Sequence, residues 1–363
     1  MVVAVQLDVH GVRTGAVTAR VDAAAELMAG LHVLAEPDHH PERARWVAEV
    51  QAVLTPGLVA ELTRLGPLWA RFRTRLLLPL TAAGSGELDE ALDMIAALDG
   101  GMFTALCAQA ICGGTDERLW DLTDATQARR FVRLSYERSS TRGALAVDLV
   151  ADPRRVRTQL LALLRALDSL FFASLWRRIR PGLARTAAMV ENSMRTYPLP
   201  LVIGSLTPSA QIDQGQQTVT FEKLQRVEIT VADRGLVLVP TELGHPHLLV
   251  KGEQLPGRPL PVVVQFPTKQ ADSGSLEELR DRLAALTDDT RLALCRHLIN
   301  ERCSTTELAR RTGMSVPQVS RHLRRLRETG LVASERQGRT VQYRLILSRV
   351  YGLGYELVKR IVM

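Results

Sequence analysis

The 363-residue sequence predicts an α+β protein built from three parts. Residues 1–196 are predicted to form a mainly helical N-terminal domain, because helix-starting prolines and apolar stripes follow one another along it. Residues 197–267 are predicted to form a small, mainly antiparallel β region, since short β-branched runs alternate with Gly and Pro. Residues 275–363 combine short helices with a basic hairpin, and we expect them to form a separate domain.

In the N-terminal part, a strand is expected first and helices follow almost without interruption. The β-branched run Val2–Val9 predicts the strand. Three of the helices begin with a proline in the first turn, where its missing N–H is not needed. The expected helices are Ala23–Leu34, Pro41–Leu54, Pro56–Leu65, Glu87–Leu98, Gly101–Ile111, Pro153–Phe172 and Trp176–Arg195.

Near Tyr197 the composition changes to short apolar runs that predict strands. These runs are separated by turn-forming residues, which favours a small sheet. The expected strands are Leu199–Leu206, Thr218–Leu224, Val227–Val231, Leu236–Val239, Leu248–Val250 and Val262–Phe266. The polar segment 267–275 is then expected to be a linker.

The C-terminal part contains two helix-start patterns in close succession. Ser304 is followed three residues later by Glu307, and Ser315 by Gln318, so a capping box is predicted at the start of each of two helices. Gly313 lies between them, and Gly330 supplies a left-handed stop after the second. Beyond that stop, alternating residues on both sides of a Gln337-Gly338 turn predict a β-hairpin. This order of elements is that of a winged helix-turn-helix.

Such a domain reads DNA by placing its second helix in the major groove, where Gln and Arg can pair with base edges. Short polar and Arg side chains near the start of that helix are expected to meet bases, and the remaining arginines to meet phosphates or the minor groove. The candidate DNA-contacting residues are Thr306, Ser315, Pro317, Gln318, Ser320, Arg321, Arg324, Arg325, Arg336 and Arg339.

The run from Thr306 to Val332 and the wing from Arg336 to Leu345 resemble the winged-helix repressors of the ArsR/SmtB family. The preceding phrase, Thr287–Leu294, matches the start of a helix in that family. The resemblance implies a homodimeric repressor or activator on a palindromic operator in double-stranded DNA. It also implies dimer contacts from the first and last helices of the domain, here Leu276–Leu286 and Ser348–Val362.

A second resemblance covers nearly the whole chain, although its motifs are diffuse. The segments that carry it are Pro37–Pro41, Gly66–Trp69, Gly235–Pro240 and His245–His247. They are similar to those of a group of bacterial ArsR-like regulators with a long N-terminal domain of undefined function. The resemblance names no ligand.

The net charge of +7 is concentrated at one end of the chain. Residues 275–363 contain 17 Lys and Arg against 10 Asp and Glu, whereas the other 274 residues contain 29 of each. A basic end on an otherwise neutral chain favours a polyanionic partner.

Metal and catalytic sites are not predicted. The positions of the family's Cys-x-Cys metal-binding pair are occupied by Ser304 and Thr306, and Cys303 lies one residue away. Cys295 lies among apolar residues and is expected in the core. No nucleophile elbow, P-loop or H-E-x-x-H motif is present. We therefore expect no cofactor and no resident metal.

The remaining histidines have ordinary explanations at the level of sequence. His245 and His247 lack a third ligand at motif spacing, so a structural role is favoured over a metal site. His39 and His40 lie between prolines, where capping or surface roles are favoured. Tryptophans 46, 69, 120 and 176 are expected in the core, although any of them could line an effector pocket.

Two classes of function remain. The first is a cytoplasmic transcriptional regulator whose N-terminal domain senses an unknown small molecule or partner. The second is an enzyme or ligand-binding protein with an appended winged helix used for protein contact. The lack of catalytic motifs and the charge asymmetry favour the regulator, and neither a signal peptide nor a membrane-spanning run of about 18 residues is apparent.

Overall fold

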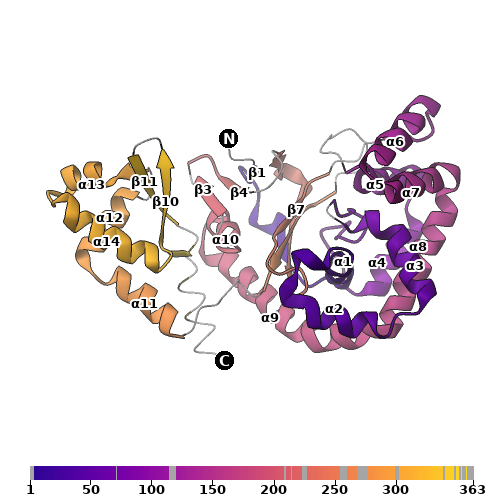
Figure 1. The fold of residues 1–363 in the computed structure, drawn as a ribbon, viewed down its shortest axis with the longest axis horizontal. Helices are drawn as coiled ribbons and strands as arrows, with labels where there is room; N and C mark the ends of the chain where they lie inside the picture. The colour runs from indigo at the N-terminus through magenta and orange to yellow at the C-terminus, as the bar shows by residue number, and fades with distance from the viewer. Residues whose placement is uncertain are drawn as a thin grey trace. The chain divides into compact units, whose positions relative to one another are not determined.

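The computed structural model describes residues 4–70, 72–113, 120–207, 210–213, 215–222, 227–253, 260–268, 276–298, 302–337, 340–346, 349, 350, 353 and 357. The chain divides into two compact units (Figure 1). The first unit comprises residues 10–196 and 229–268, and the second comprises residues 1–9, 197–228 and 269–363. Helices and small sheets occur in both units, which confirms the α+β class.

The first unit is mainly helical, as predicted. Polar caps fix several of its helix starts: the Asp22 carboxylate accepts a hydrogen bond from the N–H of Ala25 at 2.9 Å, and Asp152 does the same for Arg155. Its α-helices are α1 (Ala23–Ala35), α2 (Ala44–Gln51), α3 (Pro56–Leu65), α4 (Leu88–Ala97), α5 (Gly100–Cys112), α6 (Ala125–Arg138), α7 (Ser140–Ala151), α8 (Pro153–Leu167) and α9 (Ala173–Thr196), with the π-helical turn η5 (Asp168–Phe172) joining the last two. Of these, α6 and α7 were not individually predicted.

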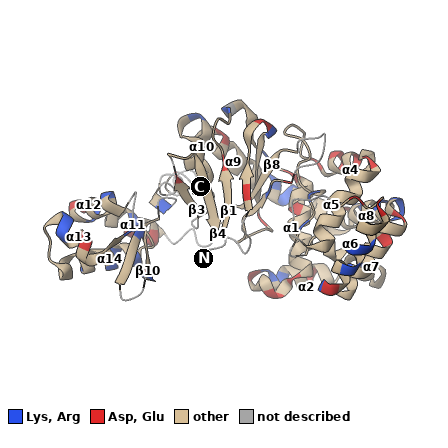
Figure 2. Cartoon of the chain, turned by 90° about the horizontal axis from the view of Figure 1, so that it is seen from above, with Lys and Arg blue, Asp and Glu red and all other residues tan. Residues whose placement is uncertain are grey.

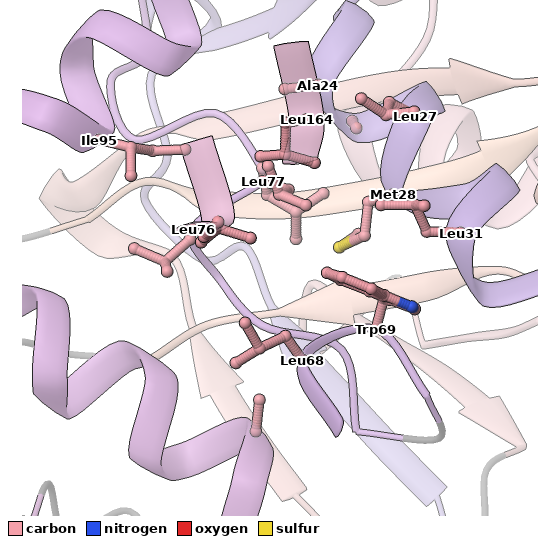
Figure 3. Packing of buried hydrophobic residues seen from close by; sticks show 14 of the residues in the cluster. Ala24, Leu27, Met28, Leu31, Leu68, Trp69, Leu76, Leu77, Ile95 and Leu164 are labelled. Atoms are coloured by element: carbon pink, nitrogen blue, oxygen red, sulfur yellow. The ribbon is translucent and has the colours of Figure 1, made fainter. Parts of the chain in front are cut away.

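One large hydrophobic core holds these helices together. Figure 3 shows Trp69 and Leu77 packed beside Met28 and Leu31 of α1, with Leu164 of α8 close by. All five side chains are almost fully buried. Each such side chain contributes about 1.5–3 kcal/mol of hydrophobic stabilisation, so the buried face of α1 alone accounts for several such contributions.

The helical stretch Pro153–Thr196 is long and apolar enough, by length and composition, to cross a membrane, and the bent pair α4–α5 would count as a second such span. The core helix of a folded protein has the same properties. In this chain the apolar stripe of α8 and the first half of α9 belongs to the core cluster of the first unit.

The sheet of the first unit has the strand order β2-β6-β8-β7. Its strands are β2 (Val17–Ala19), β6 (Leu236–Thr241), β7 (Leu249–Lys251) and β8 (Val262–Pro267). β6 runs parallel to both β2 and β8, and only β7 is antiparallel to its neighbour. β6 and β8 are buried along their whole length, as parallel strands covered on both faces must be. The unbroken apolar runs in these strands are typical of that environment.

Another sheet has the strand order β3-β4-β1-β5; its first three strands lie in the second unit, and β5 crosses the boundary between the units at residues 228 and 229. Its strands are β1 (Ala4–Asp8), β3 (Ala210–Asp213), β4 (Thr218–Glu222) and β5 (Val227–Thr230). β4 is antiparallel to β1 and to β3, as predicted for this part of the sequence. The N-terminal strand therefore completes a sheet formed by residues about 200 positions later.

One predicted strand is wrong. Residues Leu199–Ser205 form the helix α10, not a strand. Pro198 precedes the helix and Pro200 lies in its first turn, where proline is favoured because that turn needs no N–H donor. Four consecutive residues of α10, Leu201 to Gly204, are buried, so the apolar run reflects a helix surrounded by protein.

The C-terminal part of the second unit is a winged helix-turn-helix with its own core. Its helices are α11 (Leu276–Leu286), α12 (Asp289–Leu298), α13 (Thr305–Thr312) and α14 (Val316–Glu328). β9 (Cys303–Ser304) joins the hairpin of β10 (Val332–Gln337) and β11 (Thr340–Leu345) in a three-stranded sheet. Leu308, Val319, Leu323 and Leu326 are buried together, as their helical spacing predicts.

Candidate nucleic-acid interface

The two helix starts of the motif lie where the sequence predicts them. The hydroxyl of Ser304 accepts a hydrogen bond from the N–H of Glu307 at 3.2 Å, and Gly313 ends α13 in the left-handed conformation with φ of 71°. At the second helix, the N–H and the hydroxyl of Ser315 both donate to Oε1 of Gln318 at 2.9 Å. These caps fix the turn between the helices and thereby the direction of α14.

The face of α14 opposite its buried stripe is polar and basic. Ser315, Pro317, Gln318, Arg321 and Arg324 are exposed there, while Ser320 is partly exposed at its margin. Thr306 is exposed on α13. The structure thus brings most of the predicted DNA-contacting residues onto one accessible surface, which we call the α14 face.

Gln318 already has a partner. Its side-chain oxygen is occupied by the cap of α14, so only its amide nitrogen is available to donate to a base. A bidentate contact with adenine uses both atoms of the amide. Gln318 would therefore have to leave the cap in order to make that contact.

Arg325 is also engaged within the domain. One of its guanidinium nitrogens lies 3.3 Å from a carboxylate oxygen of Asp281 on α11, and both side chains are 43% exposed. An exposed pair of this kind contributes little to stability and exchanges readily with another anion. Arg325 is thus held beside the α14 face without being removed from solvent.

The wing differs from the prediction by one position. β10 and β11 are paired from Val332↔Leu345 to Gln337↔Thr340, so Gln337 ends the strand and does not begin the turn. Arg336 is an exposed residue of β10 that pairs across the hairpin with Val341. Arg339, predicted to contact DNA at the wing tip, lies outside the described residues.

Charged residues also occur on the other helices of the domain (Figure 2). Arg310 on α13 and Arg327 on α14 are exposed, and neither was among the predicted contacts. Arg302 pairs with Glu335 of β10, so part of the positive charge is balanced internally.

The cysteines of the domain lie in its core. Cys295 and Cys303 are buried, and burial raises the pKa of the Cys295 thiol to about 11. This confirms the core role expected for Cys295. The described residues contain no group of three or more His, Cys, Asp or Glu side chains positioned to hold a metal ion.

The surface role predicted for the adjacent histidines of the N-terminal domain holds for one and is wrong for the other. The His39 side chain is 65% exposed, whereas that of His40 is completely buried. The burial of His40 could not be predicted from the sequence, because two neighbouring polar residues between prolines usually lie in an exposed loop. The ring of His40 is surrounded by residues that are distant in the sequence.

Comparison with known proteins covers both halves of the chain. Residues 3–272 match a family of unknown function, DUF5937, and residues 286–335 match a helix-turn-helix domain. The HTH-type transcriptional regulator NmtR of Mycobacterium tuberculosis (strain ATCC 25618 / H37Rv) is 37% identical over 79 residues, which are 22% of this chain and 66% of that protein. The regulator KmtR of the same strain is 42% identical over 60 residues, or 16% of this chain and 46% of that protein.

Among solved structures, reduced HlyU from Vibrio cholerae N16961 is 28% identical, with 23% of this chain and 90% of that chain covered and a TM-score of 0.20. The matched segment of this chain spans just under two thirds of the length of NmtR and about half of the length of KmtR. Both relatives are named as HTH-type transcriptional regulators, in agreement with the helix-turn-helix of the C-terminal domain.

Proposed function

Because this chain belongs to the DUF5937 family of unknown function and also contains an ArsR-type winged helix-turn-helix, we propose that it is a DNA-binding transcriptional regulator. The observation that carries this proposal is the exposed polar and basic α14 face, held by two caps and a dedicated core. Arg321 would read base edges, and Arg324 and Arg336 would meet phosphates.

The regulator would act as a homodimer. Palindromic DNA requires two recognition helices about one helical turn apart, roughly 34 Å, and a dimer supplies that spacing. Support comes from exposed apolar residues on the helices that the family resemblance assigns to dimer contacts. Leu276 at the start of α11 is 64% exposed, and Leu357 near the C-terminus is 39% exposed. Large apolar side chains left in water at such positions are typical of a surface that a second copy covers.

The long N-terminal part would sense a small molecule or a partner. Its acidic and basic residues balance, so it adds little attraction for DNA. A ligand that binds better to one arrangement of the subunits shifts the population of DNA-competent dimers by its difference in affinity. The division into an N-terminal sensing domain (1–196), a β region (197–267) and a DNA-binding domain (275–363) is part of this proposal.

The test is binding of the full-length protein to the DNA upstream of its own coding sequence, compared with random DNA of equal length, by fluorescence anisotropy at several salt concentrations. Binding that is tighter to the upstream DNA supports the proposal. The matched pair Arg321→Ala and Arg327→Ala then locates the surface, because the two residues lie on one helix but point about 120° apart. Equal and weak binding of both DNAs would overturn the regulator proposal.

A further inference from the structure

Three segments that the sequence analysis treated separately meet inside the first unit. His32 lies on α1, His40 lies between the short helices η2 (Pro37–His39) and η3 (Pro41–Arg43), and His247 lies between β6 and β7. The ring centroids of His32 and His40 are 5.2 Å apart, and those of His40 and His247 are 5.1 Å apart. The charge of Arg73 acts on both His32 and His40. We call these four residues the Arg73 cluster.

Arg73 carries a buried charge that none of the described residues pairs directly. Arg73 lies in the loop after the short helix η4 (Gly66–Leu68). The residue is only 5% exposed. No hydrogen bond or ion pair joins its guanidinium to any residue that the structure describes, and Glu36 acts on it only at longer range. Burial lowers the pKa of Arg73 to about 10, so it still carries its charge at neutral pH. Burying an unpaired guanidinium is strongly unfavourable, and folded proteins normally pair such a group.

The contrast with another buried arginine of the same unit shows how unusual this is. Arg75 is 1% exposed, and its Nε and Nη1 make no hydrogen bond, but its Nη2 donates to the carbonyl oxygens of Pro79 and Pro261, and a carboxylate oxygen of Glu253 lies 3.9 Å from its Nε. Arg75 therefore ties two parts of the chain together. Arg73 has no comparable structural role.

His40 is the second buried group that lacks good partners. Its side chain is completely buried, and neither ring nitrogen makes a hydrogen bond of good geometry, although Nδ1 lies 3.4 Å from a carboxylate oxygen of Glu42 and the backbone of His245 also acts on the ring. His32 differs, because its Nδ1 lies 3.0 Å from the carbonyl oxygen of Trp69. Buried polar atoms are nearly always hydrogen-bonded, so the two unsatisfied ring nitrogens of His40, near an arginine that no described residue pairs, indicate a missing partner.

We propose that the Arg73 cluster binds a small oxyanion, the carboxylate or phosphate group of a small molecule. Two oxygens of such a group match the fork of N–H donors on a guanidinium, and charge-assisted bonds of this kind are the strong ones. The charge of Arg73 acts on His40, whose ring supplies a further hydrogen-bonding group. Three histidines would also suit a transition metal, but the fixed charge of Arg73 repels a cation and the described histidines do not form a metal-ligand group.

The surrounding hydrogen bonds connect this site to the framework of the unit. The carboxylate of Glu26 on α1 accepts hydrogen bonds from the N–H groups of Glu242 and Leu243, in the loop that carries His247. Arg43 of η3 donates to the carbonyl oxygen of Glu242 in the same loop. An anion held by Arg73 and His40 would thus contact segments that are already joined to one another. This inference rests on the proposed function only in assigning the anion the role of effector.

The test is anion binding by the full-length protein, dialysed into a chloride buffer at constant ionic strength. Inorganic phosphate and benzoate are added in separate arms, and binding is followed by calorimetry and thermal unfolding. A ligand at a hundred times its Kd is expected to raise the unfolding midpoint of the first unit by roughly 5–10 °C. The arm that saturates identifies phosphate or carboxylate as the recognised group.

Variants then locate the site. Arg73→Met removes the charge at similar volume, so it should abolish the response to the anion and leave the midpoint of the anion-free protein unchanged or higher. His40→Asn should weaken binding at least tenfold, whereas the matched change His39→Asn, at the exposed neighbouring residue, should not change it. If Arg73→Met does not fold, Arg73→Lys and the two histidine variants test whether the anion binds at the Arg73 cluster.

The outcomes separate this inference from the proposed function. Failure of both anions to shift the midpoint, or an equal response in the wild type and in His40→Asn, overturns the oxyanion site. A saturable response that Arg73→Met abolishes supports it, whether or not the protein binds its upstream DNA. Release of that DNA by the same anion in the wild type, but not in Arg73→Met, would support the effector role.

Discussion

The winged-helix domain and the first unit use charged residues in opposite ways. In the winged helix the arginines of α14 lie at the surface, and residues 275–363 as a whole carry a charge of +7. The first unit instead buries ionisable groups, among them Glu26, Arg73, Arg75 and His40. A surface arginine costs little and remains available to a polyanion, whereas a buried one must be compensated locally.

This difference indicates where each region can interact. The winged helix displays its charge to a large partner that approaches from outside. The first unit holds several of its ionisable groups in the interior, away from any large partner. The two regions are therefore suited to different classes of ligand, and the predictions below test this division from the largest expected effect to the smallest.

The largest effect is expected from Glu26→Ala. The change leaves the buried N–H groups of Glu242 and Leu243 without their acceptor, which should cost about 3 kcal/mol of unfolding free energy. Glu26→Gln keeps an acceptor oxygen and should cost clearly less. Urea unfolding of the two variants measures this, and equal losses would show that the carboxylate does not hold the loop.

Arg321→Ala should reduce discrimination between the preferred DNA and random DNA by roughly 1–3 kcal/mol, since a bidentate base contact would be lost. Arg339→Ala should instead weaken binding to both DNAs about equally, because a contact with phosphate carries no sequence information. Competition titrations measure, for each variant, the ratio of its affinity for the preferred DNA to its affinity for random DNA. If both variants keep the wild-type ratio, Arg321 is not a base-reading residue.

Acid should destabilise the first unit through His32. Burial, with a smaller contribution from the charge of Arg73, lowers the pKa of His32 to about 3, whereas the unfolded chain has the ordinary value of 6.5. The unfolded state therefore binds more protons between these values, and His32 makes stability fall by up to about 1.4 kcal/mol per pH unit as the pH drops from 6.5 towards 3. His32→Gln should flatten this decline, while His39→Gln should follow the wild type. Urea unfolding at several pH values measures the free energy of unfolding of the wild type and both variants. Parallel curves of this free energy against pH for all three proteins would contradict the role of His32.

A smaller effect is expected from Asp281→Asn. Loss of the carboxylate frees Arg325 from its partner 3.3 Å away, which should tighten binding to any DNA about twofold at low salt. Glu277→Gln, another neutralised acid on α11, serves as the control for the change in net charge. An identical gain in both variants would mean that Arg325 is not restrained by Asp281.

No effect on salt dependence is expected from removing the N-terminal part. The slope of log affinity against log salt counts phosphates neutralised by Lys and Arg, and the first 274 residues are electrically balanced. The fragment 275–363 should therefore show nearly the full-length slope, even if weaker dimerisation lowers its affinity. A much steeper slope for the full-length protein would mean that the N-terminal part itself contacts DNA.

Most local features of the winged helix could be predicted because they depend on neighbours a few residues apart. Ser304 and Ser315 cap their helices three residues on, and Gly313 ends α13 in a conformation that glycine adopts readily. The hairpin was also predictable, but its register was not, because a shift of one position changes which residue ends the strand. Nor could the sequence show that Arg325 pairs with Asp281 of another helix in the domain.

Sequence by itself determined the α+β class, the helical character of the N-terminal part and the basic winged helix, because propensity, capping and net charge are local or additive quantities. Only the tertiary structure decided that α10 is a helix, that β6 lies parallel to two neighbours, and that His40 is buried. The bond from Glu26 to Leu243 spans 217 positions, and the segments that form the Arg73 cluster are likewise distant in the chain. Such contacts exist only after the core has formed, since burial and the neighbours it supplies are properties of the whole fold.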